Sequence, residues 1–308
     1  MKEGEFEKSN NLEVESGLSE IYRAIMPWSE YARQHHAIPY PYLVEGEDKS
    51  LYFFGANHSH DPKNEQYPML KDALESFTPD IIYFEGRPSL NDPAKQQEEL
   101  NDMRRVASGM SIEEAIVAGA ESGFAVKYAF DRGIELKSPE PNTKEEYQNL
   151  IEKGFSREHI FAKYQYMIIP QWHGVRLASD KEGIGYQSLR EYVEPRLKRF
   201  QEATQWDGFD YSWDHLTMIG QELWGDPEIN QTDPDHYVPL IDPTPWPGTE
   251  QYQSPINEIA REGSLLRDRY LIREIARDLQ THSRPFVVFG ASHAVMIRPA
   301  LEKMFRYN

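Results

Sequence analysis

The chain has 308 residues and a formal charge of −18 at neutral pH, from 33 basic and 51 acidic residues. Its hydrophobic content of 39% is too high for a disordered chain, and its acidity disfavours DNA, RNA and anionic membrane surfaces as partners. The sequence contains no cysteine, which excludes disulfides and thiolate nucleophiles and leaves His, carboxylate and carbonyl groups as metal ligands.

The first residues are polar and acidic, and we expect a flexible leader over 1–17 followed by a single α/β domain over 18–308. The chain does not begin with the apolar segment of a secretion signal. Its longest apolar run, Phe286 to Ile297, is shorter than the ~20 residues that span a membrane. These features predict a cytoplasmic protein with no membrane partner.

Strands and helices alternate in the first half of the chain. We expect three helices here: Leu18 to His36, Glu65 to Phe77 and Ser111 to Arg132. We expect four strands, of which the first two are joined by the turn GEDKS: Pro41 to Val44, Leu51 to Phe54, Asp80 to Glu85 and Ile134 to Lys137. Ser111 and Glu114 have the spacing of a capping box, and Gly133 is suited to end that helix.

The second half is predicted to be mainly helical over 142–204, and then changes character over 205–256. This Trp/Pro-rich segment is predicted to be irregular, either a lid over a substrate or a loop that packs its aromatic residues on the body: Trp206, Trp213, Trp224 and Trp246. A helix, a strand and a helix complete the chain: Ser264 to Thr281, Pro285 to Phe289 and Ile297 to Arg306. The alternation predicts an α/β fold with a mostly parallel central sheet of about five or six strands flanked by many helices.

Two similar segments follow predicted strands near opposite ends of the chain. They are FGANHS, from Phe54 to Ser59, and FGASHA, from Phe289 to Ala294. Histidine occupies only 10 positions, so composition explains this repeat poorly. Residues just past the carboxyl ends of parallel strands line the ligand crevice, and each glycine would let the chain turn tightly there. We therefore expect His58 and His293 to face one cleft.

Carboxylates follow two further predicted strands, at Glu85 and Glu140. If the strands are parallel, the four polar groups converge at one edge of the sheet, where His58, His293 and Glu85 would hold a divalent metal ion such as Mn, Co or Zn. The metal would activate water; without it, a His–Glu pair can act as general base and orienting carboxylate. The alternatives are a salt bridge from Glu85 to an arginine, and a purely structural Glu140 in a proline-flanked turn.

Three more charged residues are candidates for the site. Glu121 shares a helical stripe with residues expected to pack inward, so structural pairing is the alternative to a catalytic role: Val117, Phe124 and Tyr128. Asp268 lies in the first turn of its predicted helix, where an acid also complements the helix dipole. The neighbouring Arg267 would stabilise developing negative charge.

The two histidine segments resemble the Gly-x-x-His motifs of the Tiki/TraB superfamily, which includes erythromycin-esterase-like and ChaN-like proteins. The motifs here are GANH and GASH, ending at His58 and His293, and the resemblance spans about Leu51 to Leu301. A strand-terminal glutamate of the family matches Glu85, and an arginine-rich helix matches Arg267 to Arg277. The chain has Ala56 where a threonine is frequent, and its segment 205–256 has no counterpart.

The resemblance implies different chemistry for different relatives. Tiki-type members are metal-dependent peptidases, which would make His58, Glu85 and His293 metal or catalytic residues. Erythromycin esterases imply metal-free ester hydrolysis, and ChaN-like relatives imply haem binding, with His60 or His293 as axial ligand. A minor rival is the His-x-His motif of amidohydrolases and metallo-β-lactamases, which His58 to Asp61 match only in part.

The sequence therefore predicts a metal-dependent hydrolase of a peptide, amide or ester bond in a small-molecule or peptide substrate. The alternatives are a metal-free esterase-like hydrolase and a non-enzymatic protein that binds haem or a peptide.

Overall fold

The computed structural model describes residues 17–86, 93–170, 172, 188–225, 234–244 and 253–307, so nearly all of the expected leader lies outside it. The chain divides into two compact units. Unit 1 comprises Met1–Asn142 and Leu266–Asn308, and unit 2 comprises Thr143–Leu265. Two compact units are compatible with one folding domain or with two, so the single domain over 18–308 stays a prediction.

Unit 1 is built around a five-stranded sheet in the order β1-β2-β5-β3-β4. The strands are β1 Tyr40–Glu45, β2 Ser50–Ala56, β3 Ile81–Phe84, β4 Glu135–Lys137 and β5 Pro285–Gly290. β1 and β2 form the expected antiparallel hairpin, and all other neighbours are parallel. Every residue of β3 and β5 is buried, as in strands covered on both faces. The predicted α/β class and mostly parallel sheet are confirmed.

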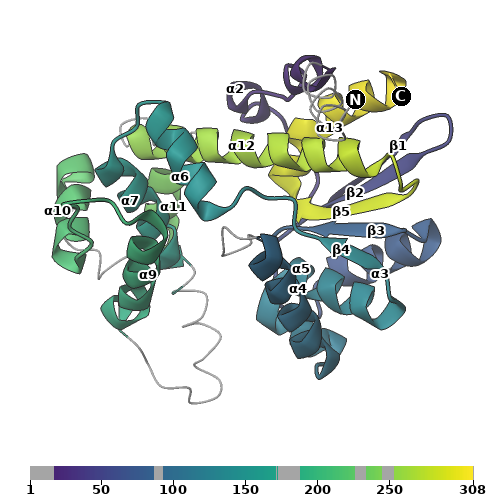
Figure 1. Ribbon diagram of the computed structural model, residues 1–308, viewed down its shortest axis with the longest axis horizontal. Coiled ribbons are helices and arrows are strands. Elements are labelled where there is room, and N and C mark those ends of the chain that lie inside the picture. Colours follow the sequence, from purple (N-terminus) through teal and green to yellow (C-terminus); the bar gives the residue numbers. More distant parts are fainter. Residues whose placement is uncertain are drawn as a thin grey trace, which may run out of the picture. The chain divides into compact units, whose positions relative to one another are not determined.

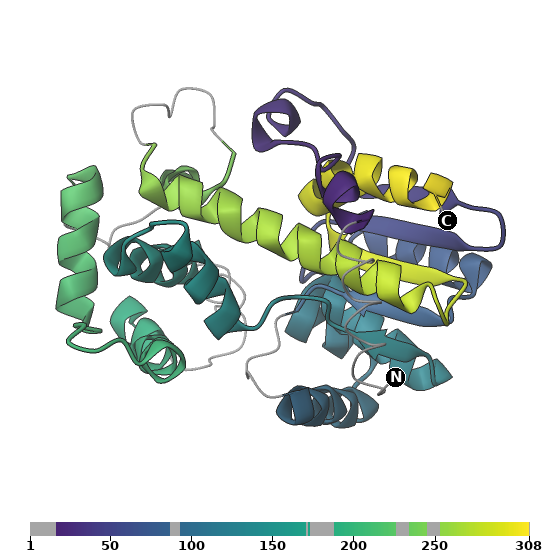
Figure 2. The ribbon, with the colours of Figure 1, turned by 45° about the horizontal axis from the view of Figure 1, so that its top comes forward.

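Helices cover both faces of this sheet (Figure 1). One face carries α13 (Ala291–Tyr307), which runs alongside the strands in Figure 2, and the unit 1 part of α12 (Pro255–Asp278). The other face carries α3 (Gln66–Phe77) and α5 (Ile112–Arg132), with α4 (Pro93–Ser108) packed against α5. Fully buried side chains such as Leu70 and Phe286 fill the space between, and each contributes about 2 kcal/mol by leaving water.

The predicted N-terminal helix over Leu18 to His36 is wrong. Residues 17–22 are helical, but the chain then leaves the helix and re-forms only one short turn, α2 (Trp28–Tyr31). Pro27 accounts for the interruption, because proline disfavours helical geometry at the residue before it and has no N–H to donate to the preceding turn.

α5 begins and ends where its sequence signals indicate. The Ser111 hydroxyl accepts a hydrogen bond from the Glu114 N–H at 3.1 Å, and the Glu114 carboxylate accepts one from the Ser111 N–H at 2.7 Å. This is the predicted capping box. At the other end Gly133 adopts φ 68°, the left-handed geometry that suits glycine.

The interior of α5 has a kink that the sequence did not predict. Gly119 (φ −141°, ψ 19°) and Ala120 (φ 50°, ψ −138°) are not helical. The kink breaks the predicted stripe: Val117 is 58% exposed, whereas Glu121 and Phe124 are buried. The inward placement of Val117 is therefore wrong, because residues before and after the kink no longer share one helical phase.

The last two helices begin earlier than predicted. α12 begins at Pro255 instead of Ser264, which places Asp268 in the middle of the helix and not in its first turn. The helix-dipole interpretation of Asp268 is therefore wrong, since that effect is confined to the terminal turns. α13 begins at Ala291 instead of Ile297, directly after β5, so His293 lies in the first turn of a helix.

Unit 2 consists of helices around a core rich in aromatic residues. Its helices before residue 205 agree with the prediction: α6 Thr143–Glu152, α7 Arg157–Tyr166 and α9 Leu189–Thr204. Within 205–256, where irregular structure was expected, α10 (Trp213–Trp224) and α11 (Pro234–Ile241) are helical. Ser212 caps α10, and Gly225 ends it with φ 71°.

Three of the four tryptophans of the 205–256 segment pack on the hydrophobic core of unit 2: Trp206, Trp213 and Trp224. This supports packing rather than a lid for those three residues, and Trp246 lies outside the described residues. Among the described helices of the chain, none is both long and apolar enough to cross a membrane.

Candidate functional site

The candidate site lies at the carboxyl ends of three adjacent parallel strands in unit 1. β5 is the middle strand; Gly290 pairs with Ala56 of β2, and Val288 pairs with Phe84 of β3. His58 and Glu85 follow β2 and β3 within two residues, and their Nε2 and Oε2 atoms lie 3.9 Å apart. The sheet thus gathers residues distant in the sequence at one edge.

The two similar histidine segments adopt different local structures. After β2 the chain continues through the non-helical segment 57–65, which carries His58. After β5 it enters α13 at once, which carries His293. Similar sequence therefore indicates a shared position at the strand ends but not a shared backbone conformation.

The two glycines of these segments permit close approach rather than a tight turn, since neither has positive φ. A Cβ added to Gly55 would lie 2.6 Å from the Cβ of Ala294, so this glycine lets α13 pack on β2. A Cβ added to Gly290 would lie 3.0 Å from Nε2 of His58 and 3.3 Å from Oε2 of Glu85. Gly290 therefore leaves the space in which these two polar groups meet.

Both histidines are held through Nδ1 by a buried carboxylate. His58 Nδ1 lies 2.6 Å from Oε1 of Glu121, and His293 Nδ1 lies 2.6 Å from Oδ1 of Asp268. Glu121 and Asp268 are 2% and 0% exposed. A carboxylate bonded to Nδ1 fixes the ring and leaves the lone pair of Nε2 available to bind a metal ion, as second-shell carboxylates do for metal-binding histidines.

Glu85 is held in its ionised form at the centre of the site. Its Oε1 accepts a hydrogen bond from Arg267 at 2.6 Å, and its Oε2 accepts one from the Gly290 N–H at 2.6 Å. Burial raises the pKa of the Glu85 carboxyl, but Arg267, His293 and His58 outweigh it and hold that pKa well below its usual range. Glu85 is therefore an anion at neutral pH.

Arg267 joins two carboxylates of the site. Its Nε donates to Oε1 of Glu140 at 2.6 Å, and its Nη2 donates to both Glu140 and Glu85. Burial opposes the charge on Arg267, but both carboxylates favour it, so its pKa lies above its ordinary value. The salt-bridge alternative for Glu85 is thus realised, and Glu140 is a buried partner of Arg267 and not only a turn residue.

His58 carries a proton at neutral pH when nothing else binds it. The hydrogen bond that His58 donates to Glu121 raises the pKa of His58 to about 9, burial acts in the opposite direction, and Glu85 adds to the increase. The imidazole remains 59% exposed, so Nε2 is accessible. A cation that binds there must displace this proton.

The site contains more carboxylates than cationic groups to balance them. Among the described residues, four carboxylates meet one arginine and two histidines: Arg267 bonds Glu85 and Glu140, His58 bonds Glu121, and His293 bonds Asp268. Three of these carboxylates have a buried second oxygen that accepts no hydrogen bond within the described structure: Glu121 Oε2, Glu140 Oε2 and Asp268 Oδ2. A buried, unpartnered carboxylate oxygen is costly, and a bound cation would remove that cost.

A group of three residues offers ligand atoms for such a cation. One ligand atom each from His58, Glu85 and Glu121 lies within 4.8 Å of the other two. Imidazole nitrogen and carboxylate oxygens suit Zn, Mn or Co, so this donor set fits the predicted divalent ion. The sequence predicted His58, Glu85 and His293 as the metal ligands. In the described structure, the group of close ligand atoms contains Glu121 and not His293.

The remaining sequence candidates lie at the margin. His60 has its Nδ1 3.0 Å from the carbonyl oxygen of Val117, and Asp61 accepts a hydrogen bond from the Lys63 N–H, which is a local turn contact. The sequence analysis did not predict α4, although the run of good helix formers from Lys95 to Leu100 indicates a helix there.

Comparisons of the chain with protein-family models, with curated proteins and with solved structures gave no match. The chemistry of the site is therefore argued from its own geometry, and the Tiki/TraB resemblance stays a prediction.

Proposed function

We propose that the protein is a hydrolase of a peptide, amide or ester bond, dependent on a divalent Zn, Mn or Co ion held at His58, Glu85 and Glu121. The observation that supports this most directly is the set of three ligand atoms within 4.8 Å of one another, next to a buried Glu121 oxygen without a hydrogen-bond partner. The resemblance of GANH and GASH to the Tiki/TraB motifs agrees with the proposal.

Each residue has a defined part in this proposal. His58, through Nε2, and Glu85 would bind the ion directly, and Glu121 would complete the group by fixing the His58 ring through Nδ1. The ion would polarise the scissile carbonyl and lower the pKa of a bound water. Arg267 keeps Glu85 ionised and immobile. His293, which is buried and fixed by Asp268, would supply a second imidazole to carry a proton.

Metal analysis of the purified chain tests the proposal. The metal-free protein is titrated with Zn²⁺, Mn²⁺ and Co²⁺ by calorimetry, and a visible spectrum is recorded. We expect one ion per chain, no haem Soret band, and hydrolysis of peptide or p-nitrophenyl ester substrates that a chelator abolishes. A Soret band, absence of metal binding, or hydrolysis that survives the chelator would overturn the metal-dependent mechanism.

A matched pair of histidine variants locates the site. His58→Gln removes the proposed ligand, whereas His60→Gln changes an exposed histidine two residues away that lies outside the ligand group. We expect the first variant to lose metal binding and activity and the second to keep both. Equal loss in both variants would show that the ion binds elsewhere in the loop.

A further inference from the structure

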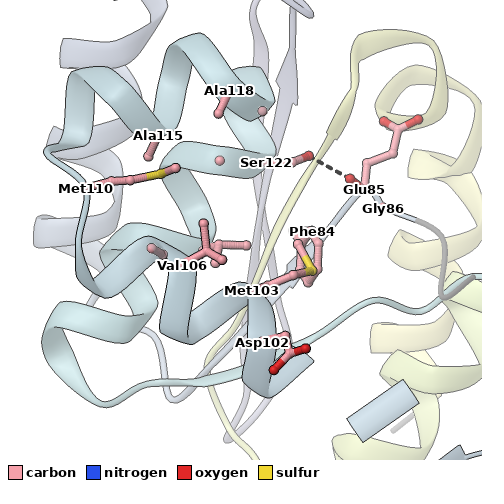
Figure 3. A pocket seen from close by; sticks show the side chains of 14 residues that line it. Phe84, Glu85, Gly86, Asp102, Met103, Val106, Met110, Ala115, Ala118 and Ser122 are labelled. Atoms are coloured by element: carbon pink, nitrogen blue, oxygen red, sulfur yellow. Dashed lines mark hydrogen bonds between the residues drawn. The ribbon is translucent and has the colours of Figure 1, made fainter. Parts of the chain in front are cut away.

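A cavity of about 580 Å³ lies beside the end of β3, between α4 and α5, all within unit 1. Its lining is mainly apolar: Phe84, Met103, Val106, Ala107, Met110, Ala115, Ala118 and Val126. Figure 3 shows the side chain of Met103 beside Phe84 and that of Met110 beside Ala115. The volume and the apolar lining are those of a small-molecule pocket.

Two apolar side chains of the pocket lining are exposed. Met103 and Val106, both on α4, are 40% and 54% exposed. Single exposed apolar residues are common, but exposed apolar residues gathered around a hollow mark a binding site.

The pocket adjoins the candidate metal site at Glu85. The Glu85 carbonyl oxygen accepts a hydrogen bond from the Ser122 hydroxyl at 2.6 Å, and both residues line the pocket. The Glu85 carboxylate points away from the pocket (Figure 3), toward Arg267, to which it is hydrogen bonded. A molecule in the pocket would thus contact the backbone of a residue whose side chain belongs to the ligand group.

The kinked part of α5 also contributes residues to both the pocket and the ligand group. Ala118 lines the pocket before the kink, Gly119 lines it within the kink, and Ser122 lines it after the kink. Between them, Glu121 turns toward His58. Glu121 of the ligand group and Ser122 of the pocket lining are therefore consecutive residues of the same helix.

We propose that this pocket binds an uncharged apolar group of the substrate, an aliphatic or aromatic side chain or a short acyl chain, next to the bond that is hydrolysed. The inference rests on the proposed hydrolase function. Among the described lining residues, Asp102 brings a carboxylate and none is Lys, Arg or His, so an anionic group is disfavoured there. Burial of apolar area supplies the affinity.

Methionine-methyl NMR tests the pocket without any assay of activity. The full chain, labelled at the methyl groups of its nine methionines, is titrated with 1-hexanol as a neutral apolar probe. We expect saturable shifts of the Met103 and Met110 methyl signals. Met69 on α3 is an internal control, since it is 45% exposed and lies outside the pocket lining, and its signal should not move.

A variant at Gly119 closes the pocket. Gly119 lines the pocket, a Cβ there meets nothing within 4 Å and its φ is negative, so Gly119→Leu should add apolar bulk at the edge of the hollow. We expect this variant to abolish the Met103 and Met110 shifts and to leave Zn²⁺ affinity within about twofold. Val117→Leu is the matched control, because Val117 is exposed and lies outside the lining.

The metal-loaded enzyme gives the second readout. Across p-nitrophenyl esters of increasing acyl length, kcat/KM should rise about fourfold per methylene, the equivalent of ~0.8 kcal/mol per buried CH₂. Gly119→Leu should flatten this series. If the esters are hydrolysed without length dependence and the methionine signals do not move, the pocket inference is overturned and the hydrolase stands. If the signals move but no ion binds and no ester is cleaved, the hydrolase proposal falls while the apolar site remains.

Discussion

Two buried ionic clusters of unit 1 use the same helix, α12, but differ in how completely their charges are paired. At the end of α12, both oxygens of Asp278 lie 2.8 Å from Nζ of Lys137, and Oδ2 also accepts a hydrogen bond from the Tyr83 hydroxyl at 2.6 Å. In the middle of α12, Asp268 bonds His293 through one oxygen and leaves the other without a partner.

The difference separates a structural cluster from a functional one. Asp278 accepts hydrogen bonds from two groups, the Lys137 ammonium and the Tyr83 hydroxyl, so its charge is compensated within the fold. The candidate site instead has four carboxylates for one arginine and two histidines, with buried oxygens that no described donor satisfies. Folding alone does not select for that arrangement, because each unpartnered buried oxygen destabilises the chain. A cation that binds after folding would explain it.

The largest expected effect is the loss of metal affinity in Glu85→Gln. The amide removes one of the proposed ligands and its charge, and we expect Zn²⁺ affinity to fall by more than about 100-fold, since even second-shell changes cost 10–100-fold. Calorimetry or competition with a chelating dye measures this. Asp278→Asn is the control from the paired cluster and should change the affinity by less than about twofold. Similar losses in both variants would remove the distinction between the clusters.

The second effect is on the free energy of unfolding, and here we expect the larger change in the paired Asp278 cluster and the smaller one in the candidate site. Asp278→Ala leaves the buried Tyr83 hydroxyl without its acceptor, while the Lys137 side chain, 35% exposed, can regain water. We expect the free energy of unfolding to fall by about 2 kcal/mol in urea titrations. In metal-free protein, Asp268→Asn should change it by less than about 1 kcal/mol, because the amide oxygen still accepts from His293 and the buried carboxylate oxygen without a partner is removed. A larger loss from Asp268→Asn would contradict the comparison.

Much of unit 1 could be predicted from the sequence, because its signals are local. Apolar runs identified β2, β3 and β5, and the Ser111 capping box identified the start of α5. The rule that polar residues follow the carboxyl ends of parallel strands brought His58 and Glu85 to one edge of the sheet.

The pairing within the site could not be predicted, because it depends on tertiary geometry. No local pattern indicates that α5 kinks at Gly119 and Ala120, and this kink separates the exposed Val117 from the buried Glu121. Nor does the sequence show that α13 begins directly after β5, which places His293 beside Asp268 and not in a loop. Which carboxylate pairs with which histidine follows from those two features.

The third prediction concerns strain on the functional side of the comparison. Ala120 has φ 50° and ψ −138°, a region that costs a residue with a Cβ of order 1–3 kcal/mol. Ala120→Gly should relieve part of this and raise the free energy of unfolding by about 1 kcal/mol. Ala118→Gly, two residues earlier in regular helix, should lower it by about 1 kcal/mol. Both are measured by denaturant titration, and destabilisation by both changes would show that the kink holds no strain.

The smallest effect is the titration of His58 in metal-free protein. Because the Glu121 hydrogen bond raises the pKa of His58 to about 9 from 6.5, Glu121→Gln should return it toward 6.5. NMR of the histidine ring protons, with the His58 signal identified by its absence in His58→Gln, measures both values. The sign of the stability effect follows from linkage: a folded-state pKa above the unfolded value makes the contribution of this pair complete below pH 6.5 and lost as the pH rises through about 9. A His58 that titrates near 6.5 with Glu121 intact would mean that the carboxylate does not hold the ring, and the site would then lack the oriented imidazole that distinguishes it from the Asp278 cluster.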